Sequence, residues 1–245
     1  MAQSTVFDMP HATRLTEART AFLDRWLRTL VARERLTTAI DVGCGVGYFS
    51  VYLKSLGLEV LGVDGRAENV AEAQRRLPGA RFVTADVQDR AIRDLGVFDV
   101  VLCVGLLYHL ENPFAAIRNL HALSGKLLVV ESVVIPSPLP AAALLGEPSG
   151  RDQALGDSVF VVSRPALIKI LYRAGFPHVY EPVALPDHDD FRESPLMHRR
   201  RTVVVAAKQP VDISELRPVG EPTSPSPWEK QFRMRLWRAF RRLTR

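Results

Sequence analysis

The chain contains few cysteines, no long apolar segment and no strong overall charge. Its only cysteines are Cys44 and Cys103, and neither their number nor their spacing fits a disulfide framework or a zinc site. We therefore expect two free, partly buried thiols. No apolar run is long enough to span a bilayer, and we find no basic-then-apolar leader. These absences exclude a secreted disulfide scaffold and predict a cytoplasmic protein without a membrane span.

The formal net charge of +5 comes from one segment of the chain. Residues 228–245 hold seven Lys or Arg and one Glu, which leaves residues 1–227 nearly neutral, at −1. A broad phosphate-binding face on the body is therefore not supported, and nucleic acid is not the favoured partner. The apolar residues of the segment recur at helical spacing: Trp228, Phe232, Leu236, Phe240 and Leu243. This pattern predicts a basic amphipathic helix.

Three roles are open for this helix. Its apolar stripe could dock on the body or on a second subunit, with the arginines solvated. Its aromatic and cationic residues also suit peripheral contact with the anionic inner membrane surface. Attachment to RNA is the third role. The oligomeric state does not follow from the sequence.

Strand and helix patterns alternate along most of the chain, whose 245 residues suit one α/β domain with additions. An amphipathic helix is expected first, at residues 13–35. Short runs of β-branched and other apolar residues predict strands at 39–42, 60–63, 81–84, 98–104 and 126–131. Helices are expected between them at 48–56, 67–77 and 113–122. This alternation predicts a parallel sheet with helices on both faces.

The rhythm changes after the fifth expected strand. Residues 132–156 contain four prolines among small residues and are expected to form an irregular insertion that can cover a site. A helix follows, with Ser163 as its N-cap and Gly175 at its end. Strands at 178–184 and 202–207 are expected to form an antiparallel hairpin at the sheet edge. Residues 209–227 contain five prolines and predict an extended linker.

A glycine-rich turn, Asp41-Val-Gly-Cys-Gly-Val-Gly47, follows the first expected strand and precedes a helix. Its glycines, Gly43, Gly45 and Gly47, permit backbone angles that side chains resist and let a ligand lie against the main chain. Helix-terminal amides can then meet a polar ligand. A tight strand-to-helix turn without a ligand is the structural alternative.

Two acidic positions follow the next expected strands. Asp64 ends the second strand, where a carboxylate can accept hydrogen bonds from vicinal ribose hydroxyls, or can instead cap a helix. Asp86 and Val87 follow the third strand and offer an acid and a backbone amide to an adenine ring. These groups are therefore expected to converge on one edge of the sheet.

Together with the segment Phe98–Pro113, these motifs resemble the class I S-adenosylmethionine (SAM)-dependent methyltransferases. The resemblance implies a Rossmann-like, seven-stranded and mostly parallel sheet that ends in an antiparallel hairpin. It also implies an enzyme whose cofactor is SAM. The dinucleotide-binding fold of nicotinamide oxidoreductases is less favoured, because the glycine spacing is G-x-G-x-G instead of G-x-G-x-x-G.

The resemblance also assigns roles to particular residues. In the family the glycine turn lies against the methionine part of SAM, the acid after the second strand binds ribose, and the aspartate after the third binds adenine. Asp41 would orient the amino-acid part, and the backbone near Gly105 and Leu107 would lie along it. The remaining cofactor-binding roles fall on Gly43, Gly45, Gly47, Asp64, Asp86 and Val87.

The resemblance and the patterns divide the chain into parts. Residues 1–36 are expected to be an N-terminal helical cap, and residues 37–207 a methyltransferase domain. Within that domain, residues 132–163 form an insertion near the acceptor site. A proline-rich linker (208–227) and the basic amphipathic helix (228–245) complete the chain.

Transfer of a methyl group to an alcohol requires a group that removes the hydroxyl proton, and histidine suits this task. His109, just past the fourth expected strand, is our first candidate, although it could instead hold the loop ahead of Asn112. His188 and His198, in the loop of the final hairpin, are the second candidates. The nearby segment Asp187–Asp190 could bind a divalent cation, but adjacent residues rarely all point at one ion, so no metal is expected.

The methyl acceptor follows least directly from the sequence. The segments around His109 and Ser163 resemble bacterial methyltransferases that act on sugars, natural products or small metabolites, and some relatives modify wobble uridine in tRNA. Methylation of a sugar or small-molecule hydroxyl is our leading hypothesis. An RNA methyltransferase and a SAM-binding module without catalysis are the alternatives.

Overall fold

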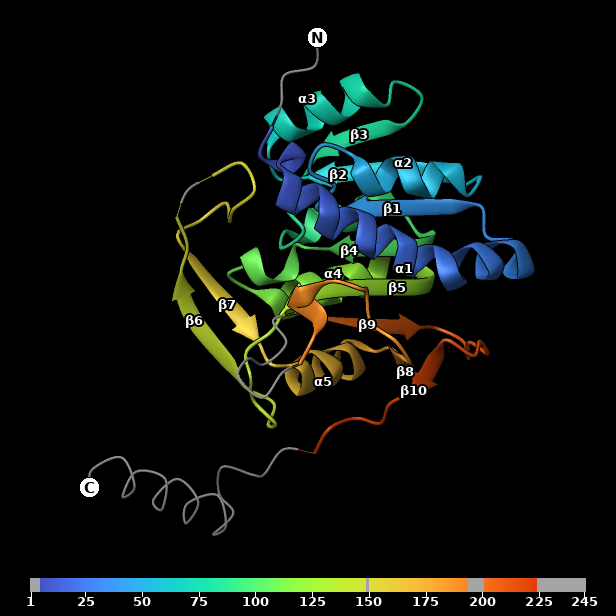
Figure 1. Cartoon of the computed structure of the whole chain (residues 1–245), viewed down its shortest axis with the longest axis vertical. Helices are drawn as coiled ribbons and strands as arrows, with labels where there is room; N and C mark the ends of the chain where they lie inside the picture. The colour runs from blue at the N-terminus through green and yellow to red at the C-terminus, as the bar shows by residue number, and fades with distance from the viewer. Residues whose placement is uncertain (1–4, 149, 194–200, 224–245) are drawn as a thin grey trace.

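The computed structural model describes residues 5–148, 150–193 and 201–223 (Figure 1). Over these residues the chain builds an eight-stranded sheet in the order β10-β8-β9-β5-β4-β1-β2-β3, and a separate pair, β6-β7. The five parallel strands are β1 (Thr38–Val42), β2 (Glu59–Asp64), β3 (Arg81–Thr84), β4 (Phe98–Val104) and β5 (Ser124–Val133). The two strands expected to close the sheet are β8 (His178–Pro182) and β9 (Arg201–Ala207), which pair antiparallel to each other.

Helices connect the strands where the sequence predicts them. They are α1 (Pro10–Glu34), α2 (Tyr48–Ser55), α3 (Ala67–Arg76), α4 (Pro113–Leu123) and α5 (Arg164–Ala174). Short 3-10 helices lie at η1 (Val6–Asp8), η2 (Arg90–Leu95), η3 (Leu107–His109) and η4 (Asp189–Phe191). The predicted α/β class, the mostly parallel sheet and its terminal antiparallel pair are therefore confirmed.

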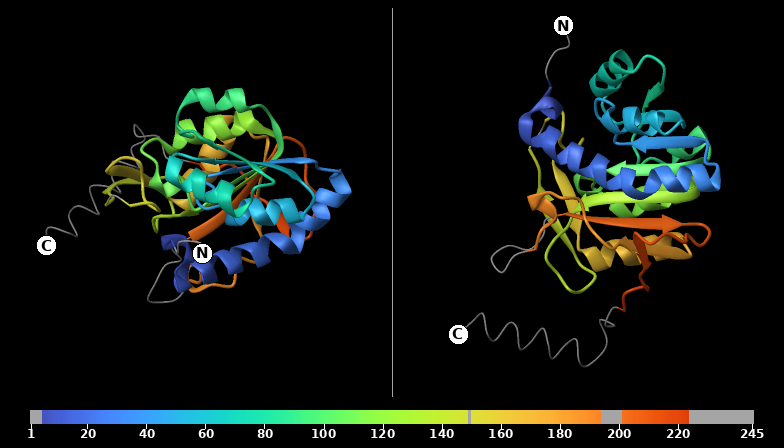
Figure 2. Two further views of the ribbon diagram at one scale, coloured as in Figure 1. Left: turned by 90° about the horizontal axis from the view of Figure 1, so that it is seen from above. Right: turned by 45° about the vertical axis from the view of Figure 1, so that its right-hand side comes forward.

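The sheet lies between two helical layers (Figure 2). Consecutive residues of a strand point to opposite faces. On β4, Val100 and Leu102 accordingly pack in the core under α1 and α2, whereas Val101 and Cys103 pack in the core under α4 and α5. Helix α1 contributes the fully buried Trp26 to the first core. The N-terminal helix is thus an integral part of one layer.

The strand order reverses between β1 and β4. β1 pairs with β2 on one side and with β4 on the other, while the chain reaches β4 only after β3. Such a reversal opens a crevice beyond the carboxyl ends of the strands, where open α/β sheets bind ligands.

The insertion after β5 differs from the irregular segment expected there. β6 (Ala142–Gly146) and β7 (Ser158–Val162) form an antiparallel hairpin. Val159 and Val161 of β7 are buried against Tyr108, whereas β6 is largely exposed and contains no β-branched residue. The pairing depends on this contact with the body, which local sequence patterns do not reveal.

Part of the expected linker also lies on the sheet. β10 (Leu216–Pro218) pairs antiparallel with β8, the Leu216 side chain is buried, and the Val211 amide donates to the Tyr180 hydroxyl at 2.9 Å. The segment therefore adds an eighth strand to the seven that were expected, because it carries an apolar anchor, Leu216, among its prolines. The predicted basic helix at 228–245 lies outside the described residues.

Both cysteines are free, as predicted, and they are buried instead of partly buried; burial raises the pKa of each thiol. Within the described residues, no helix has the length and apolarity needed to cross a bilayer.

Candidate active site

A pocket lies where the parallel strands end. Counted with its open mouth, it holds about 620 Å³ of space. Seven residues that the sequence predicts to bind cofactor or to act as the base line this pocket: Gly43, Gly45, Asp64, Asp86, Val87, Gly105 and His109. They follow β1, β2, β3 and β4, so the predicted convergence at one edge of the sheet is confirmed.

The glycine turn needs glycine for two separate reasons. Gly43 and Gly45 adopt φ angles of +77° and +53°, which side chains rarely take. A Cβ on Gly43 would also lie 2.8 Å from the Leu106 Cβ, and one on Gly45 would lie 3.1 Å from the Phe7 ring. The turn therefore exposes main chain to the pocket and leaves no room for a side chain.

The Asp64 carboxylate is held by the protein itself. Its Oδ2 accepts from the Gly45 amide (2.9 Å), and its Oδ1 accepts from the Arg66 amide (2.9 Å) and from Asn69 Nδ2 (3.2 Å). A carboxylate has about four acceptor positions, so one remains for a ligand. The N-cap residue of α3 is Arg66, which means that Asp64 does not have the alternative capping role.

The turn after β3 is fixed in a similar way. Asp86 Oδ1 accepts from the Gln88 amide at 2.8 Å, and the buried Asn119 side chain donates to the Val87 carbonyl at 2.8 Å. These hydrogen bonds fix the turn, and both Asp86 and Val87 line the pocket from it.

Three predicted cofactor residues do not line the pocket: Asp41, Gly47 and Leu107. Asp41 is buried and accepts a 2.6 Å hydrogen bond from the Ser50 hydroxyl. Burial raises the pKa of Asp41 to about 7, with a smaller contribution from the Asp64 charge. Gly47 is the N-cap of α2, with φ of +91°, and Leu107 is a core residue.

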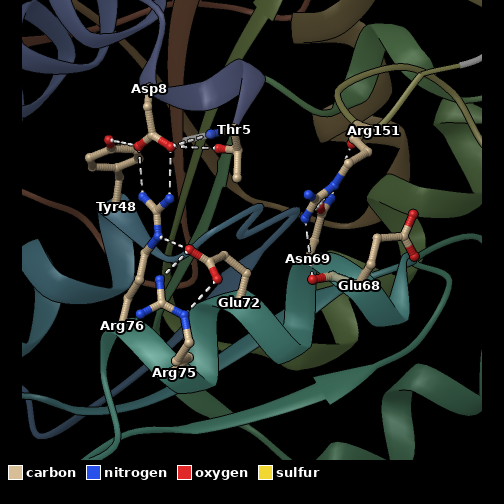
Figure 3. Close-up of polar contacts among 9 residues, drawn as sticks. All are labelled: Thr5, Asp8, Tyr48, Glu68, Asn69, Glu72, Arg75, Arg76 and Arg151. Carbon is tan, nitrogen blue, oxygen red and sulfur yellow. Dashed lines mark hydrogen bonds and ion pairs between the residues drawn. The ribbon is translucent and has the colours of Figure 1, made fainter. Parts of the chain in front are cut away.

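An N-terminal strap (residues 5–9) covers the pocket beside the glycine turn. Phe7 lines the pocket, and the neighbouring Asp8 fastens the strap to the body (Figure 3). Asp8 accepts two 2.8 Å hydrogen bonds from Arg76 on α3 and one of 2.6 Å from the Tyr48 hydroxyl on α2. The Arg76 guanidinium holds the pKa of the Asp8 carboxyl well below its usual range.

A cover loop (residues 150–155) reaches the pocket from the β6-β7 hairpin. Residues 151–155 line the pocket. Arg151 donates to the Asn69 side-chain oxygen at 3.1 Å and Asn69 donates back to the Arg151 carbonyl at 3.1 Å (Figure 3). Arg66 donates to the Ala154 carbonyl at 2.6 Å. The strap and the loop are both fastened to α3 or its N-cap. The loop lies in the insertion that the sequence predicts to cover a site, whereas the strap was not predicted, because its contacts join distant segments.

His109 is the predicted base that lies in this pocket. Its Nδ1 lies 2.6 Å from Glu147 Oε1, and its ring centroid lies 4.0 Å from that of Tyr108. Burial lowers the pKa of His109, although the Glu147 carboxylate opposes this effect. A neutral imidazole able to accept a proton is therefore favoured near neutral pH.

His188, the second candidate that the structure describes, does not line the pocket. His188 is the N-cap of η4, where its Nδ1 accepts from the Asp190 amide at 3.2 Å. His198 lies outside the described residues.

The acidic segment beside His188 takes part in ion pairs. Arg192 contacts Asp187 at 2.6 Å and Asp189 at 2.9 Å. Asp190 contacts Arg201 at 3.2 Å. Among the residues that the structure describes, no group of three or more His, Cys, Asp or Glu side chains is arranged to hold a metal ion.

A buried charge cluster stands behind Gly105. Glu131 lies between Arg19 (2.7 Å) and Arg201 (3.2 Å), and Arg201 also donates to the Tyr108 hydroxyl at 3.2 Å. Arg19 and Glu131 meet as an ion pair without hydrogen-bond alignment. The Arg19 guanidinium lies 3.6 Å from where a Cβ of Gly105 would be, so the cluster packs directly behind this glycine.

The comparisons with known proteins point to one class of enzyme domain. Residues 40–125 match the model of a family described as a methyltransferase domain. A tRNA U34 carboxymethyltransferase of Pasteurella multocida is 29% identical over 166 residues, which are 63% of this chain and 50% of that protein. A ubiquinone biosynthesis O-methyltransferase of Colwellia psychrerythraea is 36% identical over 83 residues, which are 32% of this chain and 34% of that protein.

A solved structure shares the fold. The N-terminal domain of EvdMO1 with S-adenosylhomocysteine (SAH) bound is 24% identical, with a TM-score of 0.62 over 82% of this chain and 85% of that one. The chain spans about half the length of the tRNA-modifying relatives that it matches. Residues 40–125 thus belong to a methyltransferase domain, and the chain has the fold of that SAH-bound structure.

Proposed function

We propose that the whole chain is a methyltransferase that transfers the methyl group of SAM to a hydroxyl of a sugar or another small molecule. The observation that carries this proposal is the position of His109. It shares one covered pocket with Gly43, Gly45, Asp64 and Asp86, the groups expected to hold the cofactor.

The residues of the pocket fit the parts of SAM. The exposed main chain of Gly43 and Gly45 would lie against its methionine part, and the remaining acceptor position of Asp64 would bind the ribose. Asp86 and Val87 would bind the adenine. When bound, SAM supplies an electrophilic methyl group, so the protein has mainly to align the acceptor and exclude water. The strap and the cover loop supply that exclusion.

Methyl transfer to an alcohol also requires that the hydroxyl proton be removed. An alcohol is a weak nucleophile until a base takes its proton. His109 is mostly buried, its pKa is lowered and it faces the pocket, which are the properties that this base needs. The name of the O-methyltransferase relative, which implies an oxygen acceptor, supports the same assignment.

A methyl-transfer screen against pools of sugars, phenols and RNA, followed by variants, tests the proposal. His109→Ala should keep its SAH affinity and lose roughly 100-fold or more in turnover. His188→Ala is the matched control and should stay within about threefold of the unmodified protein. Equal turnover in His109→Ala and the unmodified protein at saturating acceptor would remove the base assignment.

An RNA methyltransferase is the second candidate, and the tRNA-modifying relatives favour it. It predicts an RNA affinity that falls steeply with salt and is kept when residues 224–245 are deleted.

We also propose a cytoplasmic location and contact of residues 228–245 with the inner membrane surface. Binding of the full chain, but not of the shortened chain, to anionic vesicles at low salt tests the membrane contact.

A further inference from the structure

The β6-β7 hairpin is attached to the segment that carries His109. The Phe160 amide of β7 donates to the Leu110 carbonyl at 2.9 Å. Val159 and Val161 of β7 pack against Tyr108. The hairpin and η3 therefore hold a defined position relative to each other, and a residue at the end of β6 can be placed accurately against His109.

Glu147, the residue that follows β6, uses both carboxylate oxygens. Oε1 lies 2.6 Å from His109 Nδ1, and Oε2 accepts from the Ala154 amide at 3.2 Å. The side chains of Glu147 and His109 are only 13% and 11% exposed. An ionised carboxylate can only accept hydrogen bonds, so the proton of a neutral His109 lies on Nδ1 and the lone pair lies on Nε2.

We infer that Glu147 is a positioning residue for methyl transfer, because it fixes the His109 tautomer that leaves Nε2 free to accept the proton of the acceptor hydroxyl. This inference rests on the proposed function. In the step, the acceptor oxygen forms a bond to the methyl carbon while the carbon–sulfur bond of SAM breaks and its electron pair stays on sulfur. The hydroxyl proton passes to Nε2, and His109 becomes an imidazolium whose Nδ1 proton still faces Glu147.

Glu147 is in turn held by the loop that covers the cofactor pocket. The Ala154 amide bonds to Glu147, and the Ala154 carbonyl accepts from Arg66. The Arg66 amide bonds to Asp64. A continuous series of hydrogen bonds thus links the proposed ribose carboxylate to the proposed base, so one loop both closes the pocket and orients His109.

Three charged groups act on His109 and determine its response to pH. Glu147 and Asp152 favour the protonated imidazole, whereas Arg201 and burial disfavour it. The Tyr108 ring packs against it without a charge. Replacing Glu147 with glutamine removes the strongest of the groups that favour protonation, so the pKa of His109 falls further.

The tautomer can be measured without any methyl acceptor. Long-range proton–nitrogen NMR of the full chain with SAH bound separates the Nδ1–H and Nε2–H forms of each histidine, and His109→Ala identifies the His109 signal. The unmodified protein should show the Nδ1–H form, and Glu147→Gln a mixture or the Nε2–H form. Asp157→Asn, which removes an exposed carboxylate from the same hairpin, is the matched control and should match the unmodified protein. An unchanged Nδ1–H form in Glu147→Gln overturns the inference.

Kinetics with the acceptor identified by the screen gives the second readout. Glu147→Gln should lower kcat by roughly 10-fold or more, which is part of what a general base supplies, with KM for SAM within about threefold. The acidic limb of its pH profile should move to lower pH, and Glu147→Asp should recover part of kcat. A Glu147→Gln enzyme with the kcat and pH profile of the unmodified protein overturns the inference while the proposed function stands. If the unmodified protein methylates nothing, the proposed function fails, and the NMR result alone decides whether Glu147 sets the tautomer.

Discussion

Releasing the N-terminal strap should weaken cofactor binding, and two neighbouring arginines allow a controlled test. Arg76 forms ion pairs with both Asp8 on the strap and Glu72 on its own helix, whereas Arg75, within the part of the chain that the structure describes, pairs with Glu72 alone (Figure 3). Arg76→Gln therefore removes the ion pair that fastens the strap. Arg75→Gln removes a charge from the same helix and disturbs the same glutamate without touching the strap.

The size of the effect follows from burial and geometry. The Arg76 and Asp8 side chains are 20% and 22% exposed, and two 2.8 Å hydrogen bonds join them. Hydrogen bonds to charged groups contribute about 1.5–3 kcal/mol, and partial exposure moves this pair toward the lower end. If the substitution removes about 2 kcal/mol from the free energy of strap docking, the SAH affinity falls by at most about 30-fold. This is the limit because only molecules with a docked strap bind SAH at full strength. The remaining contacts of Asp8 with Tyr48 and Thr5 reduce this value, so we expect a loss between about 3-fold and 30-fold.

Titration calorimetry with SAH measures the affinity, and hydrogen exchange at residues 5–8 measures strap opening. Arg76→Gln should show faster exchange and weaker binding, while Arg75→Gln, 51% exposed at its side chain, should change affinity by less than about twofold. The Asp8 pKa is depressed from 3.8, so the contribution of the pair is present above that pH and is lost only as the pH falls below it. Equal affinities for the two variants near pH 7 would refute a role of the strap in cofactor binding.

Three further substitutions test other parts of the site. Asp64→Ala should weaken SAH binding by about 1.5–3 kcal/mol, and an unchanged calorimetric affinity would remove the ribose assignment. Glu131→Gln leaves the buried Arg19 without its carboxylate, while Arg201 keeps Asp190, and should lower the free energy of unfolding in urea by roughly 3–5 kcal/mol. A loss below about 1 kcal/mol would mean that Arg19 is solvated. Asp41 has a pKa raised from 3.8 to about 7, so its ionisation lowers the stability of the folded protein as the pH rises through that window. The melting temperature of Asp41→Asn minus that of the unmodified protein should therefore rise between about pH 4 and pH 7. A difference that stays constant over this range would contradict the buried-carboxyl interpretation.

The parts of the fold that sequence patterns predict are those with strong local signals. The run 98–104 coincides with β4, because a central strand buried on both faces is apolar at nearly every position. Helix α5 begins after Ser163 and ends at Gly175, as predicted, because a serine side chain caps its first turn and glycine takes the left-handed angle at its end. These signals depend only on residues close together in the chain.

The parts that were missed depend on contacts between distant residues. The insertion that contains Arg151 was expected to cover a site, but no local pattern indicates that Phe7, far away in the sequence, lines the same pocket. Glu147 is a single acidic residue beside a proline, and its role emerges only when the hairpin places it against His109. The family pattern likewise placed Asp41 and Gly47 at the cofactor. In this structure neither lines the pocket: Asp41 accepts a hydrogen bond from Ser50, and Gly47 is the N-cap of α2.

The short strand β10 also bears on how the protein avoids self-association. Without it, β8 would present a free row of amide and carbonyl groups to any other extended chain, including a second copy. β10 covers that row and is a poor template itself, since it is three residues long, contains Pro218 and exposes the charged Arg217. A chain shortened to end at Ala207 would keep the residues that line the pocket but would lose β10. Its expected failure is aggregation through the uncovered edge of the sheet, not a loss of cofactor recognition.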